Sequence, residues 1–323
     1  MPDHVIFSYI LNGLSEGQEL RHDDVARLAA KDTLTWTHLD RAHPDTRPWL
    51  LSEMSYLDES AIDALLADET RPRATVIGNG ILVVLRGVNL NEGANPEDMV
   101  SIRMWVDDKR IVTMRRRPVR AAEELAQKVA AGDGPKTSGA FLAMLADMLD
   151  ARIETAMRRL DEATDDVEEH LVVSADNALR PQIADIRRRT IQLRRHIAPQ
   201  REAVAAIKSA ALPWIGDADR RNLAEAQDRL TRFVEDLDAI RDRAQVVKDE
   251  LANVLADRLN RNTYILSVIA AIFLPLGFLT GLVGINLAGI PGAENPSAFY
   301  LFCGLLGVIV LVQIVIFRLM KWF

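Results

Sequence analysis

The sequence predicts an α/β cytoplasmic domain, a long helical stalk and two C-terminal transmembrane helices. Three observations lead to this prediction. Runs of β-branched residues alternate with helical patterns up to Gly134, no glycine or proline lies between Asp217 and Leu274, and two uncharged segments follow Arg261. Mixed strands and helices are typical of an α/β domain. A segment of that length without glycine or proline indicates one long helix. A membrane-spanning helix needs about 20 apolar residues, and both uncharged segments supply them.

Residues 1–134 form the predicted α/β domain. The turn at Asp107 is expected to join the last two strands in a hairpin, within a sheet that is mainly antiparallel or mixed. The expected strands are 5–11, 33–39, 80–89, 99–106 and 110–115, and the expected helices are 23–30, 43–54, 59–67 and 120–131.

Residues 135–216 are predicted to form antiparallel cytoplasmic helices beside the stalk. Glycine and proline at 132–135 break the chain before them. The first helical pattern covers 138–171, and Ser174 is expected to cap the second, which continues to 212 with a disturbance at Pro199.

The stalk is predicted at 217–261 and carries a heptad repeat. Such a 3.5-residue period indicates a packed helical stalk. The repeating apolar positions are Leu223, Leu230, Leu237, Ala244 and Leu251, with Ala226, Phe233, Ile240, Val247 and Val254 three residues after each.

Two predicted spans follow, at 262–286 and 298–317, joined by an outer loop at 287–297. Basic residues flank them on one side only, since Arg258 and Arg261 precede the first span and the tail at 318–323 is basic. The loop contains no Lys or Arg. By the positive-inside rule, both termini face the cytoplasm.

Several function classes are disfavoured by the residues that are present. A net charge of −7 argues against nucleic-acid binding, and the arginines at 187–189 are expected to pair with the acidic residues at 161–169. The six histidines show no zinc-ligand spacing, and His43-Pro44-Asp45 is interpreted as a turn. No phosphate-binding loop and no set of catalytic groups is recognisable, so the chain is not expected to be an enzyme or to hold a cofactor.

Small and polar residues share one face of the first span. Gly277 and Gly281 form a G-x-x-x-G pair, which is also typical of close helix packing. The face ends at Gly284-Ile285-Asn286, where a neutral amide can hydrogen-bond the water shell of a dication. The full stripe is Asn260, Thr263, Leu266, Ala270, Leu274, Gly277 and Gly281.

This triplet, placed between two terminal spans after a long helix, resembles the CorA family of divalent-cation transporters. The magnesium members of that family carry Gly-Met-Asn, whereas the isoleucine at 285 is similar to the bacterial zinc-transport branch, the ZntB-like proteins. Other segments also resemble that branch: WTHLDRAHPD at 36–45, TRPR at 70–73, IAPQR at 197–201 and LPW at 212–214.

The resemblance implies a funnel-shaped homopentamer in the bacterial inner membrane, with zinc taken up through a shared pore, in symport with protons where a gradient exists. Gly284, Ile285 and Asn286 would form the selectivity ring, and the stripe would line the pore. Glycine at 277 departs from the threonine of magnesium members. The alternatives are zinc efflux, a magnesium, cobalt or nickel channel, and a two-span anchor for a cytoplasmic coiled-coil scaffold or sensor.

Overall fold

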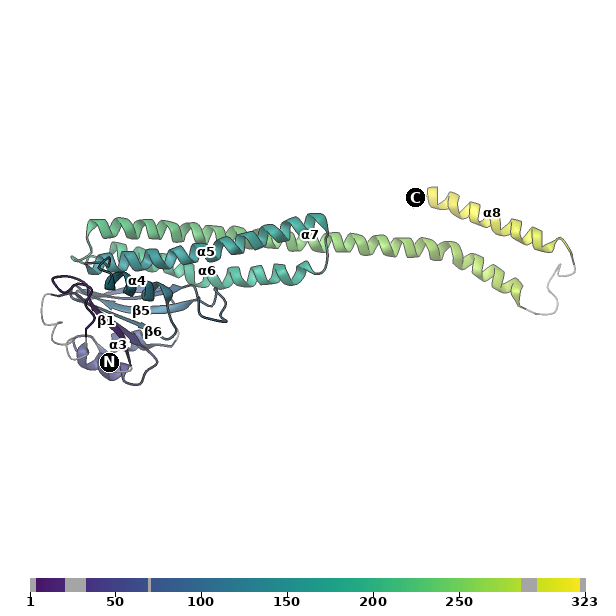
Figure 1. Ribbon diagram of the computed structural model, residues 1–323. Coiled ribbons are helices and arrows are strands. Elements are labelled where there is room, and N and C mark those ends of the chain that lie inside the picture. Colours follow the sequence, from purple (N-terminus) through teal and green to yellow (C-terminus); the bar gives the residue numbers. More distant parts are fainter. Residues whose placement is uncertain (1–3, 21–32, 69–70, 286–294, 320–323) are drawn as a thin grey trace. The chain divides into compact units, whose positions relative to one another are not determined.

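The computed structural model describes residues 4–20, 33–68, 71–285 and 295–319 (Figure 1). The chain forms two compact units, Met1–Asp249 and Glu250–Phe323. The predicted helix at 23–30 lies outside the described residues.

A six-stranded mixed sheet forms the centre of the first unit. Its strand order is β1-β2-β6-β5-β4-β3. Every neighbouring pair is antiparallel except β2 and β6, which are parallel, and β5 and β6 form the predicted hairpin. The strands are β1 (Val5–Ile10), β2 (Thr35–Asp40), β3 (Arg73–Ile77), β4 (Gly80–Gly87), β5 (Val100–Val106) and β6 (Arg110–Arg115). The prediction of a mixed sheet is therefore confirmed, and β3 was not predicted.

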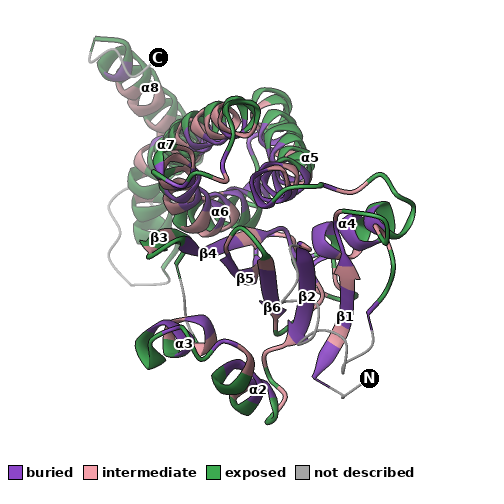
Figure 2. Cartoon of the chain, turned by 90° about the vertical axis from the view of Figure 1, so that its left-hand side faces the viewer, coloured by how far each residue is buried: buried purple, intermediate pink, exposed green. Residues whose placement is uncertain are grey.

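Helices cover both faces of this sheet (Figure 2). The short helices α2 (Thr46–Glu53) and α3 (Glu59–Leu66) cover one face, where Leu50 and Leu65 join a buried cluster with Trp105. Helices α4 (Arg120–Ala130), α5 (Ser138–Val173) and α6 (Leu179–Ser209) lie on the other face. There the ring of Trp36 meets Phe141 of α5 edge-on, with 4.9 Å between ring centroids. The alternating side-chain directions of the strands supply both apolar faces.

Helix α7 (Asp217–Gly284) packs beside α5 and α6 with its heptad face inward. Leu223, Leu230 and Leu237 are all fully buried within the single chain. Ion pairs on the flanks join the helices: Arg229 of α7 to Asp147 of α5 at 2.6 Å, and Arg194 of α6 to Asp238 of α7 at 2.8 Å. The heptad is therefore satisfied by this chain's own helices, and it is not by itself an argument for contact between subunits.

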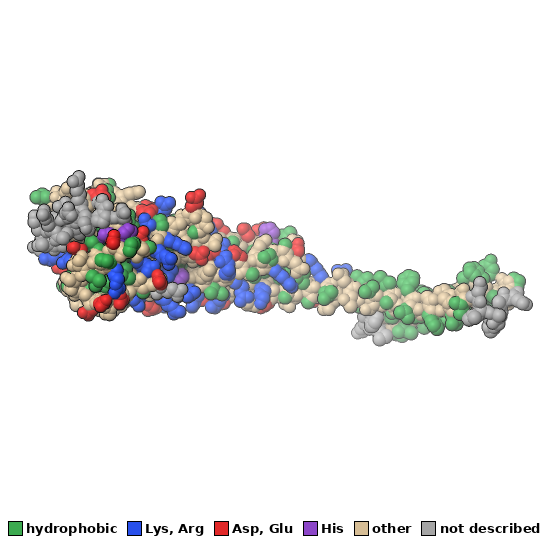
Figure 3. Space-filling model, turned by 90° about the horizontal axis from the view of Figure 1, so that it is seen from below, with side chains coloured by type: hydrophobic (Ala, Val, Ile, Leu, Met, Phe, Trp, Pro, Cys, Tyr) green, Lys and Arg blue, Asp and Glu red, His purple; other side chains and the backbone are tan. Residues whose placement is uncertain are grey.

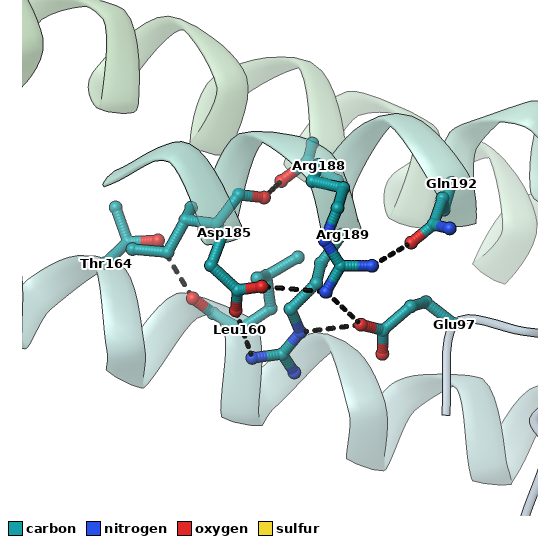
Figure 4. A network of polar contacts seen from close by, with 9 residues as sticks. Glu97, Leu160, Thr164, Asp185, Arg188, Arg189 and Gln192 are labelled. Carbon is teal, nitrogen blue, oxygen red and sulfur yellow. Dashed lines mark hydrogen bonds and ion pairs between the residues drawn. The ribbon is translucent and has the colours of Figure 1, made fainter. Parts of the chain in front are cut away.

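Buried Glu97 fixes the segment between β4 and β5 to α6 (Figure 4). Its carboxylate lies 3.4 Å from Arg188 and 3.3 Å from Arg189, and Arg188 also pairs with Asp185 at 2.7 Å. A buried carboxylate requires such partners, because an unpaired charge is costly to bury.

The predicted partners of these arginines were wrong. The acidic residues Asp161, Asp165 and Glu168 of α5 instead bind Arg243 of α7. The helix order explains the difference, because these carboxylates and Arg243 face each other across α5 and α7.

Predicted helix ends were less accurate than the helices themselves. Ser174 is the C-cap of α5, not the N-cap of α6, which begins five residues later at Leu179. Asp219 accepts a hydrogen bond from the Gly216 backbone N–H at 3.0 Å, so it supports the start of α7 from inside the helix. Pro199 lies inside α6, as expected.

The second unit consists of the rest of α7 and of α8 (Ala298–Leu319). Each helix contains an 18-residue segment apolar enough to cross a membrane, with a mean hydropathy of 2.3 in α7 and 2.7 in α8. Figure 3 shows hydrophobic side chains along this unit, whereas the first unit carries charges of both signs on the face in view. The two predicted spans are thus present as helices.

Candidate functional site

The predicted pore-lining residues all lie on α7 and are all exposed within the chain. Leu266 is 67% exposed and Leu274 is 72% exposed. Gly284 ends the helix and Ile285 follows it, and both are exposed. Asn286, the last member of the predicted ring, lies outside the described residues. The exposed stripe is Asn260, Thr263, Leu266, Ala270, Leu274, Gly277 and Gly281.

Helix α8 contacts the other side of α7, where the Gln313 side chain reaches the Ala271 carbonyl. Within the described span, Val268 is buried and Ala271, Ile272, Leu276 and Leu279 are half-buried. At about 100° per residue, the centre of this covered set lies about 165° around the helix from the centre of the predicted pore face. The second helix therefore leaves the predicted face open.

The glycines of this face have no packing role within the described chain. A side chain at Gly277, Gly281 or Gly284 would meet no other atom within 4 Å. Close packing of the G-x-x-x-G pair against α8 is therefore excluded. These glycines are free to face another copy of the chain or an aqueous path.

A hydrogen bond from a glutamine of α8 to the backbone of α7 links the two membrane helices next to a proline. Pro275 lies inside α7 and has no N–H to give to the carbonyl four residues earlier, at Ala271. The Gln313 side chain of α8 donates a hydrogen bond to that Ala271 carbonyl at 3.3 Å. In a hydrocarbon environment every backbone polar group needs such a partner. Gln313 thus compensates for the proline.

Polar side chains on the membrane part of α7 are neutral. The Ser267 hydroxyl donates to the Thr263 carbonyl at 2.9 Å, and Thr280 donates to the Leu276 carbonyl at 2.9 Å. Between Arg261 and Gly284 the sequence has no Asp, Glu, His, Lys or Arg. This face can therefore offer hydroxyl, amide and carbonyl oxygens to a hydrated ion, but no charge.

Ionisable groups with strongly shifted pKa values lie in the first unit instead. Burial lowers the pKa of His38 to about 3, and the imidazole stacks on Phe7 and contacts the Thr113 hydroxyl at 2.7 Å. Burial likewise lowers the pKa of His196 to about 4. Burial also raises the pKa of Asp150 well above its usual range, although the Arg229 guanidinium is 3.9 Å away.

One group of histidines is formed by the fold and not by spacing in the sequence. His4 and His43 come together with Asp45 in the folded chain, although no ligand spacing links them in the sequence. His4 directly precedes β1 and His43 follows β2. The pairing of these two strands brings the histidines together, which their spacing in the sequence does not reveal.

Comparison with known proteins places these features in a wider context. The family described as CorA-like Mg2+ transporter protein matches residues 31–321. The chain is 39% identical to the divalent cation transporter CmaX of Pseudomonas aeruginosa, over 98% of this chain and 96% of that protein. It is 38% identical to the zinc transport protein ZntB of Yersinia enterocolitica, over 95% of this chain and 92% of that protein. The solved structure of full-length CmaX matches with a TM-score of 0.86 and 38% identity, covering 99% of this chain and 98% of that chain.

Proposed function

Because this chain belongs to the CorA-like Mg2+ transporter family, we propose that it carries divalent metal cations, and zinc in particular, across the bacterial inner membrane. The observation that supports this most is the uncovered face of α7. It is small, polar and uncharged, and α8 covers the opposite side of the helix. A neutral lining suits a hydrated dication that must both enter and leave.

The pore is proposed to be shared by five copies of the chain. Two spans cannot enclose an aqueous path, since irregular or polar surface at membrane depth must line a cavity or be buried in protein. In the assembly, the seven exposed stripe residues of each copy would face the axis. Gly284, Ile285 and Asn286 would form the outer ring. The small residues would keep the path wide enough for a hydrated ion.

Assembly can be tested independently of transport. One chain has a mass of 36.0 kDa. Light scattering on the detergent-solubilised protein should give a protein mass near five times that value. A monomer or dimer in mild detergent would rule out the shared pore.

Both termini are proposed to face the cytoplasm, on the basis of the flanking basic residues. This orientation favours uptake. A dication that enters an inside-negative cell gains roughly 4.6 kcal/mol at 100 mV. That is a bias of more than about a thousandfold. Export would require coupling to another energy source.

Proton symport is the finer part of this proposal. The spans have no carboxylate or histidine to carry a proton, so coupling would use pore water or the carboxylates of Asp249, Glu250 and Asp257. Vesicles that contain a zinc-sensitive dye, with the potential and the pH gradient imposed separately, test this. Zinc accumulation that does not depend on the pH gradient would contradict symport. Zinc expulsion driven by an opposing proton gradient would show that transport runs outward.

The outer ring provides the sharpest test of transport. Asn286→Ala should abolish zinc flux and leave folding unchanged, because the proposed role of the amide is to hydrogen-bond the water shell of the ion. Asn295→Ala in the same loop is the matched control and should transport normally. Asn286→Asp should slow exit, because a ring of carboxylates traps the dication. Normal flux in Asn286→Ala would leave the membrane-anchor alternative, with no pore at this face.

Selectivity is expected to be broad. The proposed lining has no thiol or imidazole, which are the ligands that favour zinc over other dications. Nickel and cadmium should therefore compete with zinc for flux in the same vesicles. Strict zinc selectivity would require an additional ligand set away from the spans.

A further inference from the structure

A group of possible metal ligands lies in the first unit and includes no residue of the membrane helices. His4, His43 and Asp45 each offer one ligand atom, and these atoms all lie within 4.8 Å of one another. No residue of this group belongs to the pathway proposed above.

The sheet positions these three residues. His4 directly precedes β1, and its backbone carbonyl accepts a hydrogen bond from the Asp40 N–H at 2.8 Å, at the end of β2. The chain then turns, with the Asp40 side chain accepting from the Ala42 N–H at 2.8 Å, and enters α2. His43 and Asp45 lie in this turn, so the turn carries them back to the start of β1.

The Asp45 carboxylate is directed towards histidine and not towards the helix that it precedes. Asp45 is the N-cap of α2, a position where an aspartate usually accepts a hydrogen bond from the first turn. Here it makes no side-chain cap hydrogen bond. Its Oδ2 lies 3.7 Å from His43 Nδ1. The basic side chains beside it pair elsewhere, Arg41 with Asp68 and Arg47 with Glu59.

The group has the composition of a zinc site, and its ligand atoms lie somewhat farther apart than bound ligands would. At zinc–nitrogen and zinc–oxygen distances of about 2.0–2.2 Å, two ligands of a tetrahedral ion lie about 3.3 Å apart. The 3.7 Å pair already approaches that separation. Rotation of exposed Asp45 and half-buried His43 can bring both towards His4, which is 5% exposed and held against Trp49.

We propose that His4, His43 and Asp45 bind a divalent transition metal of the zinc class, with water at the fourth position. Two imidazoles and one carboxylate suit zinc and its neighbours, whereas magnesium prefers oxygen ligands alone. The bound ion would link the start of β1 to the turn between β2 and α2. This site does not depend on transport, so the two proposals can fail separately.

The test measures zinc binding to the full-length protein in detergent after removal of metal with a chelator. Competition with a chromophoric chelator should show one tight zinc per chain. His43→Ala should lose it, and Asp45→Asn should bind at least about tenfold more weakly. His170→Ala is the matched control, an exposed histidine on α5 outside the group, and should bind as the wild type does.

Two further readouts separate binding from folding. Zinc should raise the unfolding temperature of the wild type and of His170→Ala but not of His43→Ala. The metal-free proteins should differ only slightly in unfolding temperature, because half-buried His43 accepts a local hydrogen bond, from the Asp45 N–H at 3.2 Å.

The pore variant completes the comparison. Asn286→Ala should keep this zinc while it loses flux, and His43→Ala should keep a functional pore. The proposal is overturned if His43→Ala retains the full stoichiometry and affinity, or if magnesium displaces the zinc at equal concentration.

Discussion

The two parts of α7 bury their apolar residues in opposite ways. In the first unit, Leu230 and Leu237 are fully buried by α5 and α6 of the same chain. In the second unit, Phe273 is 66% exposed and Leu274 is 72% exposed within the described chain. A single helix therefore meets its packing needs within the chain at one end. At the other end its apolar residues stay exposed within the chain, where the proposed assembly would place lipid and further copies.

This contrast indicates where the proposed assembly would form its contacts. A soluble monomer rarely leaves so large an apolar surface uncovered. The first unit has a closed core of its own, whereas lipid and other copies of the chain would cover the second in the proposed assembly. Mutations in the two parts of α7 should accordingly affect stability and transport separately.

The largest expected effect comes from opening the buried face in the first unit. Leu237→Asp places an uncompensated charge among α5, α6 and α7, which should cost more than about 4 kcal/mol of unfolding free energy. Val246→Asp on the same helix is the control, because Val246 is 67% exposed. It should change the free energy by no more than about 0.5 kcal/mol. Urea unfolding in detergent measures both, and equal effects would refute the assignment of the buried face.

The second unit should respond in flux and not in stability. Gly277→Leu adds a side chain where the chain has no neighbouring atom within 4 Å. In the proposed assembly it forms a hydrophobic constriction that dewets, and zinc flux should fall by about a hundredfold or more. Gly307→Leu on α8 has the same open surroundings and should transport normally. Equal flux in both variants would move the pore to another face.

A buried imidazole tests how closed the core of the first unit is. The folded pKa of His38 is lowered to about 3, below the usual value of 6.5, so the unfolded chain binds the extra proton first. The stability of the neutral form is fully present above about pH 6.5 and is lost as the pH falls towards 3. Between pH 7 and pH 5 the loss should be about 2 kcal/mol.

Comparison with His38→Gln isolates this contribution. The variant should lack about 2 kcal/mol of the pH dependence, whatever its absolute stability. His196 and Asp150 are present in both proteins, so their own titrations cancel in the difference. Parallel pH profiles for the two proteins would mean that the imidazole is solvated.

The smallest effect is expected where α7 and α8 meet. Gln313→Leu removes the hydrogen bond to the Ala271 carbonyl that Pro275 leaves without its helical donor. Polar contacts between membrane helices contribute about 0.6 kcal/mol on average and up to about 1.7. Thermal unfolding in detergent should show a loss in this range. Ser267→Ala, which breaks a bond within one helix, should show less.

Much of this architecture could be predicted because local patterns and tertiary packing agree. The β6 strand has its predicted bounds of Arg110–Arg115, and the heptad of α7 correctly identified its buried face. The β3 strand was missed because Arg73–Ile77 is a short edge strand whose residues are exposed or half-buried, so it lacks an apolar pattern.

The remainder depends on proximity between distant residues. Arg243 binds carboxylates of α5, a pairing set by helix order and not by spacing. His4 and His43 are brought together by β1 and β2, which no linear motif reveals. The sequence predicted which residues form the small and polar face of α7. That this face lies opposite α8 follows only from the packing of the two helices. The position of Asn286 stays a prediction, since it lies outside the described residues.

The parallel pair of β2 and β6 has a consequence for the order of events during synthesis. β2 ends at Asp40 and its partner begins at Arg110, so the middle of the sheet cannot close until β3, β4 and β5 have been made. The antiparallel strands from β3 to β6 pair locally and can form first, while β2 waits for a distant partner. The membrane helices emerge later still. If synthesis stalls before β6 is made, β2 can pair with β1 but its other edge has no partner strand. Chaperones could bind that exposed edge.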